Sequence, residues 1–351
     1  MTGPDEPLVR DWSAPFPVDV RMTLSVHRRG SGDPAYRVDA AGAVWRTSLT
    51  PEGPATLRIL PARFPMTASR DGLPSSGGLP FSGGLPFSGG PPSSAAPLAP
   101  VGPLAPAGPV ISAAAWGPGA AWMLATLPAM LGADDEWAGF RPEHPLLRQM
   151  AARHTGLRIG RTHRVMEALV PAVLEQKVLG VEAHRAWRTL MYRYGTPAPG
   201  PAPRGMRVFP SPPTWARIPS WEWHRVGVEA VRTRTIAAAA QVAGRMEETT
   251  GLGAAEAGAR LRVIPGIGVW TAAEVMQRAS GDPDAVSVGD YNLPKAVGWA
   301  LAGRVVDDAG MLELLAPYAG HRYRVTRLVE LSGVRPPRRG PRLPVRDYRG
   351  F

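Results

Sequence analysis

The chain has 351 residues with 44% hydrophobic content, which is enough for two domains with sizeable cores. A formal net charge of +11 favours an acidic partner such as nucleic acid, although a high arginine content is also typical of GC-rich genomes. The absence of cysteine excludes a thiol nucleophile, a disulfide framework and a cysteine-ligated iron–sulfur cluster.

Residues 1–150 are predicted to form an α+β domain. The chain starts without the basic and apolar regions of a signal peptide, so we expect a cytoplasmic location. Residues 18–26 alternate between apolar and polar, which predicts a half-buried strand. Residues 36–39, 44–49 and 56–60 predict further strands of an antiparallel sheet, with a helix after Trp122.

A low-complexity tract interrupts this domain. Residues 64–109 consist mainly of Gly, Pro, Ser, Ala and Leu, and residues 73–90 form a short tandem repeat. Such a tract cannot bury enough apolar surface to offset the entropy lost on ordering. We therefore predict a disordered insertion in a hairpin of the N-terminal domain.

The next stretch, residues 110–131, carries no charged side chain and is long enough to span a bilayer. The tripeptide Gly117-Pro118-Gly119 interrupts it in the middle. We therefore predict a buried strand, a turn and a buried helix over residues 121–131, and no membrane insertion.

From residue 151 to residue 335 the chain is predicted to be helical, with a Pro-rich loop over residues 196–213. Residues 336–351 are rich in arginine and proline and are predicted to be a disordered basic tail. The expected helices cover residues 165–176, 181–194, 219–226, 230–247, 253–263, 271–279, 291–301, 309–315 and 321–331.

The most informative stretch is residues 261–275 (LRVIPGIGVWTAAEV), which predicts a helix, a glycine corner (residues 265–268) and a second helix. Pro265 is expected to end the first helix. Gly266 and Gly268 open backbone angles that other residues avoid and allow a phosphate to approach closely. Ile267 is expected to point into the core. A helix starting near Thr271 directs its N–H groups and its dipole toward an anion.

A single carboxylate, Asp290, follows in residues 288–293 (VGDYNL). A fixed carboxylate can stabilise a developing positive charge, or orient or deprotonate a water molecule. The alternative is that Asp290 only caps a helix beginning near Tyr291, and the two roles can coexist.

Together these motifs resemble the helix-hairpin-helix DNA glycosylase superfamily, and within it the bacterial 3-methyladenine (alkylbase) branch. The resemblance extends from about residue 161 to residue 333 and includes residues 167–177, 227–236 and 315–322. It implies an α+β domain followed by an all-α glycosylase core, acting as a monomer on double-stranded DNA with a damaged base, at the bacterial nucleoid. This chain departs from the branch at the acid motif, because the branch often has two adjacent acids where this chain has Gly289 and Asp290, and at the wedge, where the branch prefers an apolar residue.

The resemblance also assigns site residues. Asp290 is implied to be catalytic, and the branch inserts a wedge into the DNA where this chain has Gln176 and Lys177, although a lysine there could instead hold a phosphate. A cationic alkylated base favours aromatic partners. The residues expected to bind a DNA phosphate are Gly266, Ile267, Gly268 and Thr271, and the candidates for the base pocket are Trp270, Tyr291, Trp221 and Tyr318.

No organic cofactor and no catalytic metal are expected. The resemblance implies at most a monovalent cation, Na⁺ or K⁺, on the backbone carbonyls of Ile264 and Gly266, where it would bridge to a phosphate. The histidines His163, His184 and His321 lack the spacing of metal ligands.

The activity implied is hydrolytic removal of a flipped, damaged base during base-excision repair. Bifunctional relatives have a lysine where this chain has Trp270, and an indole cannot form a Schiff base, so no lyase step is expected. Two alternatives stay open: a non-catalytic DNA-binding protein that keeps the glycine corner, and a glycosylase for another lesion such as uracil or hypoxanthine.

Overall fold

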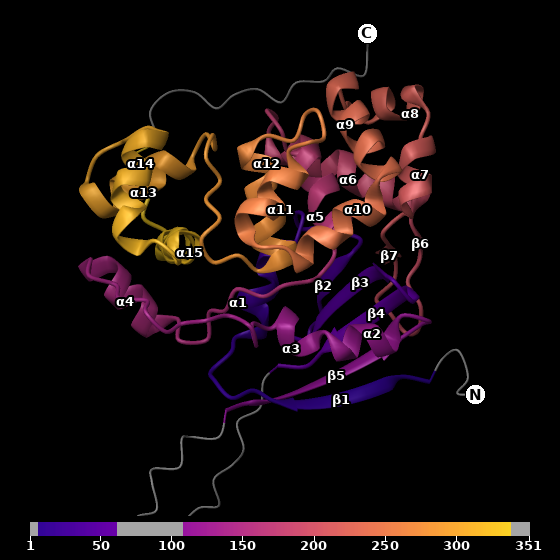
Figure 1. Ribbon diagram of the computed structural model, residues 1–351. Coiled ribbons are helices and arrows are strands. Elements are labelled where there is room, and N and C mark those ends of the chain that lie inside the picture. Colours follow the sequence, from indigo (N-terminus) through magenta and orange to yellow (C-terminus); the bar gives the residue numbers. More distant parts are fainter. Residues whose placement is uncertain (1–5, 62–107, 338–351) are drawn as a thin grey trace, which may run out of the picture.

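The computed structural model of the protein describes residues 6–61 and 108–337. A twisted sheet forms one end of the molecule, a core of helices packs over it, and a smaller group of helices lies beside that core (Figure 1). The predicted fold class, an α+β domain followed by a helical core, is confirmed.

The N-terminal sheet is antiparallel, with the strand order β1-β5-β4-β3-β2. Short helices pack on it, and their apolar side chains share one core with the strands. The strands are β1 (Leu8–Ser13), β2 (Tyr36–Val38), β3 (Val44–Thr50), β4 (Gly53–Ile59) and β5 (Val110–Trp116), and the helical segments are α1 (Val20–Leu24), η1 (Ser25–His27), α2 (Ala120–Ala125) and α3 (Leu127–Met130).

The prediction of a strand over residues 18–26 is wrong, because this segment forms α1 and η1. The alternation is also compatible with a helix, since Val20, Thr23 and Leu24 fall on one helical face and are all buried. Asp19 decides between the two by accepting a hydrogen bond from the Met22 N–H (2.9 Å) as the N-cap. The true first strand, β1, lies at the sheet edge and has mostly exposed side chains, so it carries little apolar pattern.

The strand, turn and helix predicted for residues 110–131 are present as β5, a turn at Gly117 and the pair α2 and α3. None of the helices in the described ranges has the length and apolar character needed to cross a bilayer. The strands β4 and β5, on either side of the repeat tract, pair directly with each other. The predicted insertion therefore connects two neighbouring strands, and residues 64–107 of it lie outside the described residues.

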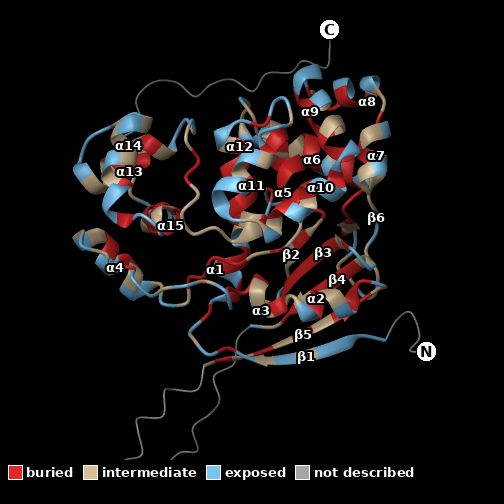
Figure 2. Ribbon diagram, in the orientation of Figure 1, coloured by how far each residue is buried: buried red, intermediate tan, exposed pale blue. Residues whose placement is uncertain are grey.

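The helical core is built around α5 (Val165–Leu174), in which nine of ten residues are buried (Figure 2). The remaining residue, Glu167, faces the sheet, where its carboxylate accepts hydrogen bonds from the Ser48 hydroxyl (2.7 Å) and the Leu49 N–H (2.8 Å). This contact joins the core to β3. The other elements of the core are α6 (Gly180–Tyr194), β6 (Thr196–Pro197), β7 (Arg207–Val208), α7 (Pro212–Arg217), α8 (Ser220–Arg225), α9 (Ala230–Gln241), α10 (Ala243–Glu247), η2 (Glu248–Gly251), α11 (Ala254–Leu261), α12 (Val269–Val275) and η3 (Met276–Ser280).

The segment η3 is a wide π-helical turn that continues α12. It brings the Arg278 side chain to the N-terminal domain, where Nε donates to the Val26 carbonyl oxygen at 3.0 Å. The same guanidinium pairs with Glu274 (2.8 Å), one turn earlier on α12. The helix that follows the glycine corner is therefore attached at its far end to the N-terminal domain.

The third group of helices has its own apolar core. It includes α4, a helix that the sequence analysis did not predict, and α4 packs against α15 at the other end of the chain. The division at residue 150 stays a prediction, and this packing favours placing α4 with the C-terminal helices. The members are α4 (Pro145–Arg153), α13 (Leu293–Ala302), α14 (Asp308–Leu315), η4 (Ala316–Tyr318) and α15 (Arg322–Ser332).

A fully buried ion pair holds this group to the linker that precedes α4. The side chains of Asp135 and Arg324 are both inaccessible to solvent, and Nη1 of Arg324 lies 3.0 Å from Oδ2 of Asp135. Asp135 also accepts hydrogen bonds from the Trp137 indole (3.1 Å) and the Ile159 N–H (2.9 Å). Each charge is thus neutralised where water cannot reach it.

We expect Asp135→Asn to lower the free energy of unfolding by about 3–5 kcal/mol, because it leaves the Arg324 charge buried without a counter-charge. The matched control is Asp134→Asn, since Asp134 is about half exposed and pairs with Arg161 at 3.5 Å. That control should change stability by less than about 1 kcal/mol. Urea unfolding measures both, and equal losses in the two variants would contradict the importance of the buried pair.

Candidate active site

The glycine corner has the conformation that its sequence predicts, with one correction. Helix α11 ends at Leu261, before Pro265, so the proline lies within the connecting loop and does not itself end the helix. Ile267 is 5% exposed and belongs to the helical core, as expected. Gly266 has a φ of +93°, in the region that favours glycine.

Two side chains from other segments, one on a helix and one in a loop, hold the corner in place. The Thr235 hydroxyl of α9 donates to the Pro265 carbonyl oxygen (3.0 Å), and a Cβ on Gly266 would lie only 2.0 Å from that hydroxyl oxygen. The Gln176 amide donates to the Gly266 carbonyl oxygen (2.9 Å) and to the Thr271 hydroxyl (2.8 Å). Gly266 is therefore required both by its backbone angle and by the lack of space.

Gly268 is a different case. Its φ of −91° is open to any residue, and a Cβ there would meet nothing within 4 Å. The prediction that its backbone angle requires glycine is wrong. Gly268 is the N-cap of α12, whose first N–H groups have no partner inside the helix. A small residue at this open position leaves those N–H groups accessible to an anion.

Asp290 lies next to this helix. Its Oδ2 accepts a hydrogen bond from the indole Nε1 of Trp270, the second residue of α12, at 3.3 Å. Its Oδ1 accepts the N–H groups of Asn292 (2.7 Å) and Leu293 (2.8 Å), at the start of α13. The carboxylate therefore bonds to the start of α13 through one oxygen atom. Because Asp290 is partly exposed, its other oxygen atom, beside α12, lies near solvent.

Sequence reasoning missed the groups that position this carboxylate. Gly289 has a φ of +92°, and its N–H donates to Oδ1 of Asp308 on α14 at 3.1 Å. An acidic group therefore does lie beside Gly289, but it comes from a distant part of the sequence. No local motif indicates it.

A buried polar network fixes the residues just before Asp290. The Ser287 hydroxyl donates to Glu274 Oε1 (2.6 Å), and it accepts a hydrogen bond from the Gln277 amide (2.9 Å). The same amide also donates to the Ala285 carbonyl oxygen (2.9 Å). Glu274 follows Trp270 by one helical turn, so the two side chains lie on the same face of α12. From this face Glu274 binds Ser287 and Trp270 binds Asp290.

The four base-pocket candidates do not come together. Trp270 and Tyr291 lie beside Asp290, and Tyr291 is 74% exposed. Tyr318 is buried in the core of the third helix group, where its ring lies against Phe140. Trp221 is 63% exposed on α8, which lies at the opposite side of the helical layer from α13 (Figure 1). All four were candidates because they are aromatic, but the tertiary structure determines which of them lie near Asp290.

The two wedge candidates also differ from each other. Gln176 is engaged with the glycine corner through its two hydrogen bonds. Lys177 is exposed and has a φ of +54°, which is uncommon for a residue with a Cβ. Both follow Glu175, which accepts two hydrogen bonds from Arg29 (3.0 and 3.1 Å) and lies 3.4 Å from His184. The loop is thus anchored at Glu175 and Gln176, while Lys177 faces solvent.

The described residues contain no group of three His, Asp or Glu side chains arranged to hold a metal. The backbone carbonyls predicted to bind a monovalent cation each accept one hydrogen bond, Ile264 from the Ile267 N–H and Gly266 from Gln176. A carbonyl oxygen can accept a second partner. The residues therefore fit the cation, and its binding stays a prediction.

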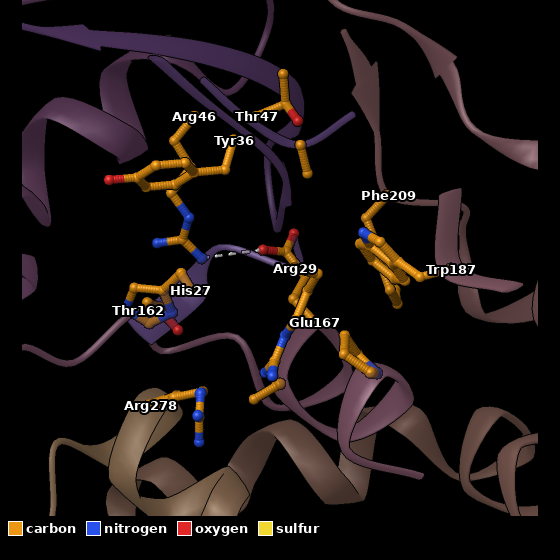
Figure 3. Close-up of a pocket in the computed structure, with 13 residues that line it drawn as sticks. His27, Arg29, Tyr36, Arg46, Thr47, Thr162, Glu167, Trp187, Phe209 and Arg278 are labelled. Carbon is orange, nitrogen blue, oxygen red and sulfur yellow. Dashed lines mark hydrogen bonds and ion pairs between the residues drawn. The ribbon is translucent and has the colours of Figure 1, made fainter. Parts of the chain in front are cut away.

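A cavity of about 30 Å³ lies away from Asp290, between the sheet and α5 (Figure 3). It has room for one or two water molecules and none for a base. Burial, together with the nearby Arg46 and Arg278, holds the pKa of His27 well below its usual value, so the imidazole there is neutral. The paired charges that line it make it part of the polar packing between sheet and core, and it is not the candidate site.

Comparison with known proteins agrees with this architecture. The 3-methyladenine DNA glycosylase from Archaeoglobus fulgidus superposes with a TM-score of 0.63 at 15% identity, covering 92% of this chain and 98% of that one. An 8-oxoguanine glycosylase/lyase from Clostridium acetobutylicum, solved with double-stranded DNA, gives a TM-score of 0.60 at 9% identity and covers 93% and 99%. No family model matches the chain.

One curated relative adds a match in sequence. A Mycobacterium tuberculosis protein described as a probable bifunctional transcriptional activator/DNA repair enzyme AlkA is 33% identical over 153 residues. The match covers 42% of this chain and 30% of that protein. The chain thus spans less than a third of the length of the curated relative that it matches.

The sheet, the helical core and the glycine corner ahead of a single acid define the helix-hairpin-helix DNA glycosylase fold. The resemblance that the sequence indicated is confirmed. Both the 3-methyladenine and the 8-oxoguanine glycosylase share this fold with the chain, and the match in sequence is to the mycobacterial AlkA relative.

We expect Gly266→Ala to lower the stability of the fold and Gly268→Ala to lower the affinity for DNA. Alanine at 266 must adopt a φ of +93° and displace Thr235, so stability should fall by about 2 kcal/mol or more. Alanine at 268 should leave the free energy of unfolding within about 1 kcal/mol of the wild type, but weaken binding to duplex DNA. Urea unfolding and fluorescence anisotropy measure the two effects. Unchanged DNA binding by the stable Gly268→Ala variant would contradict a phosphate at that position.

The anchor at Glu175 predicts a dependence on pH. Burial alone raises the pKa of Glu175, but Arg29, with His184 as a further partner, outweighs it and lowers the pKa from 4.5 to about 2. The stabilisation is therefore complete above about pH 4.5 and is lost as the pH falls through about 2. At most it amounts to about 3 kcal/mol.

We therefore expect Glu175→Gln to be less stable than the wild type at pH 7, with a difference that shrinks as the pH falls toward 2. The exposed Glu256, 62% accessible, provides the control Glu256→Gln, for which the difference should be near zero throughout. Unfolding by urea at pH 7 and pH 3 compares the variants. A Glu175→Gln deficit that is the same at both values would show that the ion pair is not its source.

Proposed function

We propose that the protein is a DNA N-glycosylase of base-excision repair. The observation that carries the proposal is the hydrogen bond from Trp270 to Asp290, because it fixes the Asp290 carboxylate to a residue that lies two positions after the open backbone at Gly268. A phosphate bound at the glycine corner would place the neighbouring nucleotide, turned out of the duplex, beside that carboxylate. The net charge of +11 supports binding to DNA.

The reaction would proceed by loss of the base from C1′ of the extruded nucleotide. Positive charge develops on the deoxyribose as the N-glycosidic bond breaks, and the ionised Asp290 would stabilise it. Three donors hold the carboxylate in place before the substrate arrives, so little reorganisation is needed during the reaction. Water would then add to C1′, with Asp290 accepting or orienting its proton.

The proposed substrate is an alkylated purine. Such a base is cationic and leaves readily, so a single carboxylate is sufficient, and the aromatic ring of Trp270 favours a cation. A mycobacterial relative whose description includes DNA repair, and an archaeal 3-methyladenine glycosylase of the same fold, support this choice. Uracil or hypoxanthine as substrate, and DNA binding without catalysis, are the alternatives that the same experiment tests.

We further propose that the enzyme is monofunctional. Trp270 occupies the position at which bifunctional relatives carry an amine, and its indole nitrogen already donates to Asp290. An indole cannot attack C1′ to form a Schiff base. The protein would act as a monomer with chromosomal DNA in the cytoplasm.

The test is Asp290→Asn assayed on duplexes that carry 3-methyladenine, uracil or hypoxanthine. Asparagine keeps the oxygen atom that caps α13 and removes the negative charge, so DNA binding should persist while base release falls by about 10²–10³-fold. The matched control is Asp307→Asn at the N-cap of α14, where the side chain likewise caps a helix, through the Gly310 N–H (2.9 Å). That variant should keep full activity.

Abasic sites are revealed by alkali, and release from one lesion alone identifies the substrate. Full activity of Asp290→Asn would remove the carboxylate from the mechanism. Absence of base release by the wild type from every duplex would favour the non-catalytic alternative. Strand cleavage by the wild type without alkali would contradict a monofunctional enzyme.

A further inference from the structure

The basic residues of this chain are almost all arginines. Of the forty, thirty-eight are Arg and only two are Lys, at positions 177 and 295. Both lysines lie at the candidate site: Lys177 follows Gln176, which bonds to the glycine corner, and Lys295 follows Asp290 by five residues. In a chain that uses arginine elsewhere, two lysines placed at one site point to a shared requirement for a compact ammonium group.

Lys295 has a defined position. Its Nζ lies 3.2 Å from the ring centroid of Tyr291, a residue that is 74% exposed. Tyr291 directly follows Asp290, so the ammonium group is held over an open ring next to the candidate acid. A cation–π contact in water is weak and uses one face of the ring, so the ammonium can also take a stronger anionic partner.

The contacts around Asp290 show where such an anion would lie. Trp270 attaches the acid to the helix that begins at the glycine corner, whereas the two N–H groups on Oδ1 attach it to the start of α13, where Lys295 lies. The acid is thus attached both to the helix that begins at the corner and to the start of the helix that carries Lys295. An extruded nucleotide beside Asp290 has one phosphate on each side as well.

We propose that Lys295, supported by the Tyr291 ring, binds the DNA phosphate on the side of the extruded nucleotide opposite the phosphate held by the glycine corner. This inference rests on the proposed function, because it takes Asp290 to face an extruded nucleotide. The two phosphate contacts would fix the sugar between them, so that C1′ meets the carboxylate.

The first experiment measures binding to a duplex that carries a tetrahydrofuran abasic analogue, which needs no catalysis. Lys295→Met keeps the apolar stem and removes the charge. If Lys295 neutralises one phosphate, the slope of log K against log salt concentration should decrease in magnitude by about 0.9. The control is Arg204→Met, an exposed cation between β6 and β7, on the opposite side of the molecule from α13 (Figure 1). It should leave the slope unchanged.

The second experiment locates the contact. Each phosphate around the abasic analogue is replaced in turn by a neutral methylphosphonate, and binding by the wild type and Lys295→Met is compared. At one position flanking the analogue, the replacement should weaken the wild type about tenfold or more and leave Lys295→Met unaffected. The Gly268→Ala variant should lose its sensitivity at a different flanking position.

An unchanged salt slope for Lys295→Met, or equal losses for both proteins at every replaced phosphate, overturns the inference. Thermal unfolding of Lys295→Met, expected to match the wild type, separates a lost contact from a damaged fold. The outcome is distinct from failure of the proposed function, because release of bases by the wild type is measured separately, on the lesion duplexes.

Discussion

The hydrogen bond between the Trp270 indole and Asp290 connects the two halves of the candidate site. One partner lies on the helix that starts at the glycine corner, and the other starts the helix α13. A carboxylate on a mobile loop would lose much of its effect on a developing charge, because it would first have to be ordered. This bond, with the two backbone donors on Oδ1, orders the carboxylate in the protein itself.

The surroundings of that bond are fixed by polar contacts between segments that are distant in sequence. Gln176 bonds to the glycine corner from the loop after α5, and Ser287 bonds to Glu274 beneath Asp290. Asp308 reaches Gly289 from α14. The site is therefore assembled from four separate segments: the loop after α5, the glycine corner with α12, residues 287–293, and α14. Hydrogen bonds between these segments hold them together.

The sequence was sufficient for the parts of the site that depend on local backbone chemistry. The glycine corner and the acid after it were recognisable, because Gly266 and the cap at Asp290 act within a few residues. The sequence was not sufficient to place Tyr318 and Trp221, since an aromatic side chain can lie in a core or on a surface, and only the packing of the folded chain determines which. It failed at residues 18–26 for a related reason, because a short amphipathic helix and a strand share that pattern.

The wide turn η3 has a consequence for the geometry of the whole molecule. A π-helical turn accommodates one residue more than a regular turn. Removing that extra residue would rotate everything after it by about 100° around the helix axis. The Arg278 side chain would then no longer reach the Val26 carbonyl oxygen, and α12 would lose this hydrogen bond to the N-terminal domain. The one extra residue of this turn thus sets how the helical core is oriented on the N-terminal domain.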